Sequence, residues 1–327
     1  IAALGLLFVG SQTVWMAFLF QSTVSALAAV VKPSTEAAIP NLVRDDAELA
    51  KANSLFGSTW GVMLAVGAAI GGVFASVFGR DAAFIANAVS FALAAIMFAS
   101  VRQPMQMTRE KSAVNQRIRP IADMREALVH ARRDPVLLAL IFSKTTFAIG
   151  AGVVSQLAVL ASDVFKGGDS SRGLLIAARG VGAGLGPLLA ARYTGGDINK
   201  VLKVCGISSL IFSGCYLIGA WMPALILTAV FITIAHLGGG AQWTLSTYGL
   251  QLRSPDHVRG RILAGDFALV TLTLSVTSAL AGIASELLGV RQAISVFAIA
   301  AALASVVYIK AIQRLRNLPQ PQINAEP

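Results

Sequence analysis

Four ionisable side chains lie within stretches of sequence that are otherwise apolar, and these are the residues that could do chemistry: Lys144, Arg179, His236 and Asp266. Charge inside a membrane is costly, so such residues are functional candidates by default. Lys144, about eight residues into an apolar run, could attract an anionic substrate or pair with a carboxylate. His236 lies near the middle of another run, and its ordinary pKa near 6.5 suits proton loading and release.

Each of these residues also has a plainer interpretation. Arg179 is close enough to the end of its run to extend its guanidinium into the interface. His236 could be a core residue with a satisfied hydrogen bond. Asp266 could titrate a proton, or form a local ion pair with Arg259 and Arg261. Several polar and aromatic residues could line a cavity for an aromatic or amphipathic substrate: Trp15, Gln21, Trp60, Gln156 and Trp243.

The composition indicates a membrane protein. The chain has 327 residues, of which 56% are hydrophobic and 13% charged, and its mean hydropathy is +0.72. Apolar runs of about 20 residues recur along the chain, and each could cross the roughly 30 Å hydrocarbon layer as a helix. The sequence therefore predicts an all-α polytopic membrane protein. No catalytic motif occurs and the three histidines lack metal-ligand spacing, so we expect neither an enzyme nor a metal or other cofactor.

These runs divide the chain into segments. A helix remnant is expected at 1–10, and a polar stretch covers 102–135. The tail from residue 312 is polar and contains proline, which is typical of disorder. Complete spans are predicted near 14–32, 54–78, 82–101, 136–161, 174–194, 201–221, 224–248, 262–285 and 291–311.

Two charged segments, "PNLVRDDAELAKAN" (residues 40–53) and "LQLRSPDHVRGRIL" (residues 250–263), reveal an internal repeat. An ungapped offset of 210 residues places Asn41 on Gln251, Asp46 on Asp256 and Gly79 on Gly289. We call these segments the charged knots and interpret them as equivalent loops of two repeats. Applied to the other spans, the offset predicts a parent protein of twelve spans, from which roughly 75 N-terminal residues are missing here.

Lysine and arginine placement predicts the orientation. Alternate loops on one side, including both knots, residues 102–135 and the C-terminus, hold twenty Lys and Arg residues, whereas the other side holds four. The basic side is expected to be cytoplasmic. The net charge of +10 then reflects topology and does not indicate nucleic-acid binding.

Two six-span repeats joined by a long basic loop resemble the major facilitator superfamily. The segments "PSTEAAIPNLVRDDAELAKANSL" and "LQLRSPDHVRGRILA" resemble the loops before the fifth and eleventh spans of its bacterial exporter branch, which includes the enterobactin exporter and macrolide efflux proteins. Gly67, Gly71 and Gly72 match the family's antiporter motif, except that Ala68 replaces its proline. Small residues at these positions are expected to allow close helix packing.

This resemblance implies the major facilitator fold, with about two and a half helices of the first half missing. Residues 1–101 would be the remnant of the N-terminal half, 102–135 the central loop, 136–311 the C-terminal half and 312–327 a cytoplasmic tail. It also implies a secondary transporter of a bacterial inner membrane, exporting an amphipathic small molecule such as a siderophore, a macrolide or another drug in exchange for protons. The sequence does not fix the oligomeric state and is compatible with a monomer.

Two alternatives remain open at this point: a lipid or lysophospholipid flippase on the same fold, and a non-transporting membrane protein. If the halves rock against each other, carboxylates of one knot could pair with cations of the other on the cytoplasmic side. The candidate gate residues are Asp45, Asp46, Glu48, Arg253, Asp256, Arg259 and Arg261. The simpler interpretation is that both knots are solvated loops.

Overall fold

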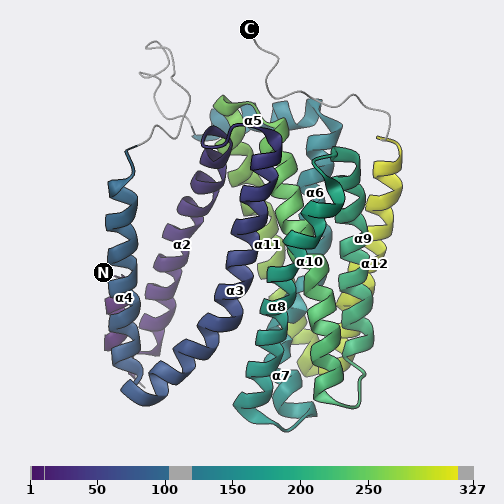
Figure 1. Ribbon diagram of the computed structural model, residues 1–327. Helices are drawn as coiled ribbons and strands as arrows, with labels where there is room; N and C mark the ends of the chain where they lie inside the picture. Colours follow the sequence, from purple (N-terminus) through teal and green to yellow (C-terminus); the bar gives the residue numbers. More distant parts are fainter. Residues whose placement is uncertain (1, 11, 103–119, 316–327) are drawn as a thin grey trace.

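Long helices that run roughly antiparallel to one another make up the computed structural model (Figure 1). It describes residues 2–10, 12–102 and 120–315. The helices are α1 (Ala2–Gly5), α2 (Val14–Ala38), α3 (Asp46–Phe78), α4 (Arg80–Ser100), α5 (Pro120–Arg133), α6 (Pro135–Ala151), α7 (Leu157–Val159), α8 (Gly168–Thr194), α9 (Ile198–Gly219), α10 (Leu225–Arg253), α11 (Asp256–Leu288) and α12 (Val290–Gln313). Short 3₁₀ and π turns cover 6–8, 39–41, 152–156 and 160–164.

Eight helical segments within the described ranges are long and apolar enough to cross a membrane. They are Val14–Asn41, Arg80–Ser100, Pro135–Val164, Ser170–Thr194, Ile198–Gly219, Leu225–Arg253, Asp256–Leu288 and Val290–Gln313. Helix α3 has 33 residues and is therefore about 50 Å long, also enough to span. The prediction of an all-α polytopic membrane protein is confirmed.

The offset of 210 residues relates helices as well as sequence. Helices α3 and α11 each have 33 residues and begin 210 positions apart. Each is followed by a glycine of positive φ, 85° at Gly79 and 92° at Gly289, and then by another spanning helix. Positive φ is readily adopted by glycine and is strained for other residues. The same sharp corner therefore joins α3 to α4 and α11 to α12.

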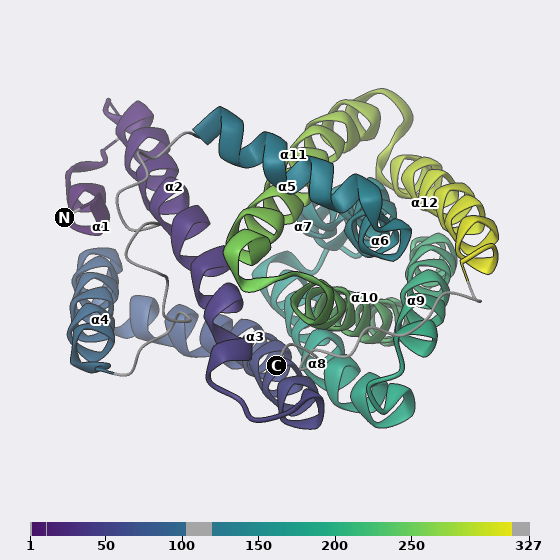
Figure 2. The ribbon, with the colours of Figure 1, turned by 90° about the horizontal axis from the view of Figure 1, so that it is seen from above.

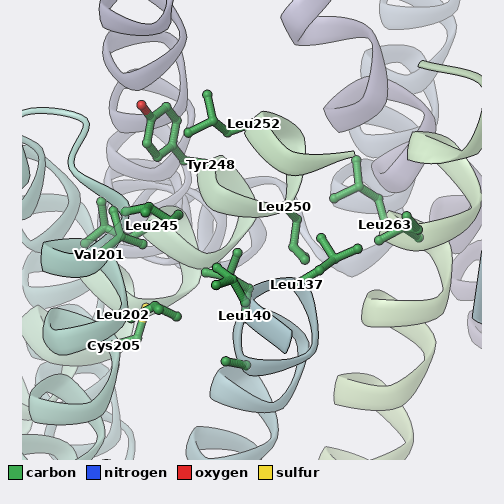
Figure 3. Packing of buried hydrophobic residues seen from close by; sticks show 14 of the residues in the cluster. Leu137, Leu140, Val201, Leu202, Cys205, Leu245, Tyr248, Leu250, Leu252 and Leu263 are labelled. Atoms are coloured by element: carbon green, nitrogen blue, oxygen red, sulfur yellow. The ribbon is translucent and has the colours of Figure 1, made fainter. Parts of the chain in front are cut away.

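The helices fall into two groups, α1–α4 and α6–α12, which we call the N-terminal and C-terminal groups (Figure 2). The C-terminal group contains most of the buried core. Near the end that carries the charged knots, leucines of α6, α10 and α11 meet residues of α9, as Leu137, Leu140, Leu250 and Leu263 illustrate (Figure 3). By contrast, the most apolar windows of α2 and α4 contain no buried residue.

The two groups meet most closely where α3 crosses α8. A Cβ atom at Gly61 would overlap the backbone of Ala183 and Gly184, and one at Gly180 would lie 2.6 Å from the nitrogen of Ala65. Only glycine permits backbones to approach to this extent. We call this contact the glycine crossing.

Gly67 and Gly71 make no close helix contact among the described residues, so the packing predicted there stays a prediction. No described atom lies within 4 Å of a Cβ built at either position. The surroundings of the third motif residue, Gly72, lie outside what the structure describes. The close approach falls instead at Gly61, within the same helix.

Each charged knot contains the short connection between two helices, together with the start of the second helix. Only residues 42–45 and 254–255 are non-helical within them, and the helices that follow begin at Asp46 and Asp256. Asp45 caps α3 by accepting a hydrogen bond from the backbone N–H of Glu48 at 2.8 Å. Both knots lie at the same end of the bundle as α5 (Figure 1). We call this the knot end; residues 103–119 and 316–327 lie outside the described ranges.

Candidate functional site

A buried ion pair joins α6 to α11 inside the C-terminal group. Lys144 Nζ lies 2.5 Å from Asp266 Oδ2, and the two side chains are only 2% and 3% exposed. Lys144 is the tenth residue of α6 and Asp266 the eleventh of α11, so both lie about 15 Å from the knot end. At that depth neither charge reaches the interface unaided. The pair is therefore an intramembrane charge site formed by segments 122 residues apart in sequence.

Helix α10 supplies the remaining contacts of Lys144. Its ammonium group donates to Thr247 Oγ1 at 2.9 Å and lies 5.3 Å from the centre of the Trp243 ring. Asp266 is less completely satisfied, because its Oδ1 is buried with no hydrogen-bond partner among the described residues. Buried polar atoms normally have a partner, and an orphaned carboxylate oxygen is a place for a proton or a donor.

A second ion pair approaches the same tryptophan from the N-terminal group. Lys32 on α2 lies 3.2 Å from Glu36, one turn along the helix, and 5.6 Å from the Trp243 ring centre. The side chains of this pair are 38% and 18% exposed, so it is more accessible than the buried pair. Trp243 therefore lies beside two ammonium groups, one from each group of helices. We call Lys32, Glu36, Lys144, Asp266 and Trp243 the double ion-pair site.

The sequence suggested parts of this site but not its assembly. Lys144 was predicted as a buried charge that could pair with a carboxylate, and it does. The local pairing of Asp266 with Arg259 and Arg261 was wrong, because Asp266 faces α6. The span predicted near 14–32 placed Lys32 at the end of a helix, but α2 continues to Ala38 despite Pro33. The i, i+4 spacing of Lys32 and Glu36 inside an apolar segment was the available signal.

The predicted gate pairs between the knots are also corrected. The knot arginines bind other carboxylates: Arg253 pairs with Asp134 at 2.6 Å, Arg259 with Asp256 at 3.1 Å and Arg261 with Glu126 at 2.6 Å. Asp45 and Glu48 instead serve the start of α3, where Glu48 accepts a hydrogen bond from the N–H of Arg44. Partial burial and the neighbouring Asp45 carboxylate raise the pKa of Asp46.

The two knots nevertheless touch through uncharged amides. Asn41 donates to Asp256 Oδ1 at 2.9 Å and accepts from Arg259 at 3.3 Å. Its repeat equivalent Gln251 accepts from Asn53 at 2.6 Å and donates to the carbonyl of Glu36 at 2.6 Å. These four bonds, which we call the amide latch, connect the two groups at the knot end.

Arg179 and His236 lie further from the knot end. The Arg179 guanidinium lies 5.6 Å from the ring centre of Trp60, which belongs to α3, so it faces the N-terminal group. Its Nε is buried without a hydrogen-bond partner among the described residues. His236 is 3% exposed, and its Nε2 lies 2.9 Å from the hydroxyl of Tyr216. The interpretation of His236 as a hydrogen-bonded core residue fits this geometry.

The two glutamine candidates lie apart from the double ion-pair site. Gln21 is exposed on α2, whereas Gln156 is 6% exposed in the 3₁₀ turn after α6 and donates to Ser155 at 3.1 Å.

Within the described ranges, no group of three or more His, Cys, Asp or Glu residues could hold a metal ion. The two ion pairs of the double ion-pair site can transfer protons and exchange partners.

Comparisons with known proteins identify the family and several relatives. The family model described as transmembrane secretion effector matches residues 1–325. The staphyloferrin A transporter of Staphylococcus aureus is 23% identical over 268 residues, which is 79% of this chain and 64% of that protein. The putative bacilysin exporter BacE of Bacillus subtilis is 24% identical over 241 residues, 73% of this chain and 58% of that protein. The chain thus spans less than two thirds of the length of either relative.

Proposed function

The chain belongs to the transmembrane secretion effector family of the major facilitator superfamily, and from this premise we propose that it exports an amphipathic small molecule in exchange for protons. The names of two relatives support this proposal: the staphyloferrin A transporter supports transport, and the putative bacilysin exporter BacE supports export. The observation that carries the proposal is the buried Lys144–Asp266 pair next to the contact between the two helix groups. Ionisable pairs in such positions mark proton and substrate pathways in transporters.

Asp266 is the proposed proton carrier. Its Oδ2 holds Lys144 while its Oδ1 has no partner among the described residues, so a proton has a free oxygen to bind. The charged groups that face it are Lys144 from α6 and Lys32 and Glu36 from α2. Protonation removes the charge that holds Lys144. Because breaking a buried pair without neutralisation costs about 3–5 kcal/mol, protonation and pair opening are coupled.

The amide latch is the proposed cytoplasmic gate. It connects the two groups at the knot end, where the basic loops gather, and basic loops are typically cytoplasmic. Alternating access requires the halves to part at one end while they meet at the other. In this proposal the structure is the form closed to the cytoplasm, in a bacterial inner membrane.

Everted membrane vesicles test the proposal with compounds of three charge classes. Vesicles from cells that express the protein are made acidic inside by respiration, and accumulation is measured for ethidium, carboxyfluorescein and radiolabelled β-(1-naphthyl)-L-alanine, which are a cation, an anion and a zwitterion. We expect at least one compound to accumulate above vesicles without the protein, and nigericin, which collapses the proton gradient, to abolish this.

Asp266→Asn should abolish gradient-driven accumulation at unchanged protein level. Asp81→Asn is the matched control, because Asp81 is an exposed carboxylate at the start of α4 and pairs only with the neighbouring Arg80 among the described residues. Accumulation of none of the compounds would contradict export. Accumulation that persists in nigericin and in Asp266→Asn would contradict proton coupling.

A further inference from the structure

We propose that the double ion-pair site binds an amphipathic zwitterion, a molecule with one amine, one carboxylate and an apolar or aromatic body. The inference rests on the proposed export function and names the class of substrate for that site. In the bound state the amine replaces Lys144 as the partner of Asp266, the carboxylate is held by Lys144 and Lys32, and the apolar body stacks on Trp243.

The two lysines lie close to the same tryptophan, so a ligand beside that ring could contact both. Their nitrogens lie 5.6 Å and 5.3 Å from the same ring centre, so they are at most 10.9 Å apart. Two ammonium groups over one tryptophan ring are unfavourable for a third cation and favourable for an entering anion. Lys32 is the accessible member, with a side chain 38% exposed, and is therefore the first contact for an entering carboxylate.

The orphaned oxygen of Asp266 points to a donor on the ligand. A buried carboxylate can accept several hydrogen bonds, but Asp266 Oδ1 receives none from the described residues. A protonated amine supplies up to three N–H donors and one positive charge. It could therefore satisfy Oδ1 and also replace the charge that Lys144 provides when Lys144 turns to the substrate carboxylate.

Charge balance separates the three possible ligand classes. The site contains two ammonium groups and two carboxylates, so it is neutral when all are ionised. A bound cation or anion would add one uncompensated charge in a region of low dielectric, where this is costly. A zwitterion adds none, and every charged group keeps an oppositely charged partner.

The charge balance of the site also explains how a proton could be exchanged for the zwitterion. The groups facing Asp266 are Lys144, Lys32 and Glu36, and a proton on Asp266 removes the acceptor for the substrate amine. Proton and zwitterion therefore exclude each other, as exchange across a membrane requires. An anion would instead bind best together with the proton, because only then would the site stay neutral, and the two would move in the same direction.

Equilibrium dialysis of the purified protein in lipid nanodiscs tests the inference without a gradient. Three matched probes are compared: β-(1-naphthyl)-L-alanine, its N-acetyl derivative and its amide, which are a zwitterion, an anion and a cation. We expect the zwitterion to bind about tenfold or more tightly than either derivative, because a site built for a polar group discriminates strongly against its loss. Its affinity should fall when the pH is lowered from 8 to 6.

Variants assign the preference to particular charges. Lys32→Gln should no longer bind the zwitterion more tightly than the amide. The double variant Lys144→Gln/Asp266→Asn, which leaves no unpaired buried charge, should bind the zwitterion no more tightly than either the amide or the N-acetyl derivative. Lys203→Gln is the control and should keep both preferences, because Lys203 is an exposed residue on α9. Equal binding of the three probes, including binding of none, would overturn the inference, as would preferences that survive in the double variant.

The two proposals fail separately. If the vesicles accumulate ethidium or carboxyfluorescein while the dialysis shows no zwitterion preference, export stands and the substrate class is wrong. If the zwitterion preference is found and no compound accumulates in vesicles, the binding site stands and export is wrong.

Discussion

Breaking the Lys144–Asp266 pair should destabilise the protein far more than its surface ion pairs do. For two unit charges 2.5 Å apart, an effective dielectric constant of about 20 gives an attraction of about 7 kcal/mol, which offsets the several kcal/mol lost when each ion leaves water. Lys144→Gln removes the attraction but leaves the Asp266 charge buried, a cost of about 3–5 kcal/mol. At roughly 2 °C per kcal/mol, the thermal midpoint should fall by roughly 6–10 °C.

A double-variant cycle isolates this effect. Thermal midpoints are measured by tryptophan fluorescence for the unsubstituted protein, Lys144→Gln, Asp266→Asn and the double variant. We expect the double variant to recover most of the stability, since it buries no unpaired charge. Glu126→Gln is the control. The Arg261–Glu126 pair is also short, at 2.6 Å, but its side chains are 30% and 53% exposed, so its loss should cost less than about 1 kcal/mol.

The pH dependence of stability tests the same explanation in a second way. In Lys144→Gln, a proton on Asp266 removes the unpaired buried charge, so the folded form takes up a proton more readily than the unfolded form does. Stability then rises as the pH falls, and the defect should be smaller at pH 5 than at pH 8. A double variant no more stable than Lys144→Gln, or a defect independent of pH, would refute the account of the pair.

Three further results are expected. Gly61→Ala should impair folding or transport, because the added Cβ would overlap α8. Gly67→Ala, where no described atom lies within 4 Å of the added Cβ, should change the thermal midpoint by no more than about 2 °C. Equal effects of the two substitutions would contradict the glycine crossing. Asn41→Leu removes two bonds of the amide latch, and hydrogen exchange of residues 256–262 should accelerate about fivefold or more, while an unchanged rate would exclude a gating role. His236→Leu should lower the free energy of unfolding by about 1–3 kcal/mol, because it leaves the Tyr216 hydroxyl without a hydrogen-bond partner. The variant should still show proton-driven accumulation. Loss of that accumulation would assign His236 to the proton pathway.

The sequence predicted the class of fold because hydrophobic runs of spanning length are a local signal. It also identified Lys144 and Asp266 individually, since a charge in an apolar run stands out at once. Their pairing could not be predicted, because it depends on which faces of α6 and α11 meet across 122 intervening residues. The nearer arginines offered a local partner for Asp266, and only the helix packing shows that its side chain faces away from them.

Errors at the knots have a different physical origin. The span predicted near 14–32 ended too early. Proline inside a helix removes one hydrogen bond and crowds the carbonyl four residues earlier, yet α2 continues past Pro33 to Ala38. Charge likewise suggested carboxylate–arginine contacts between the knots. The carboxylate of Asp45 is instead occupied by the start of α3, and the neutral amides of Asn41 and Gln251 make the connection.

The position of the glycine crossing gives α3 the mechanics of a balanced lever. Gly61 is the sixteenth of 33 residues, so arms of about 23 Å and 26 Å extend to either side of the point where α3 rests on α8. A tilt of about 10° about such a fulcrum would carry the two tips about 4 Å in opposite directions, given arms of this length. If α3 tilts as one body, separation at the knot end brings the opposite tip inward by nearly the same amount, so one helix would link movements at the two ends of the bundle.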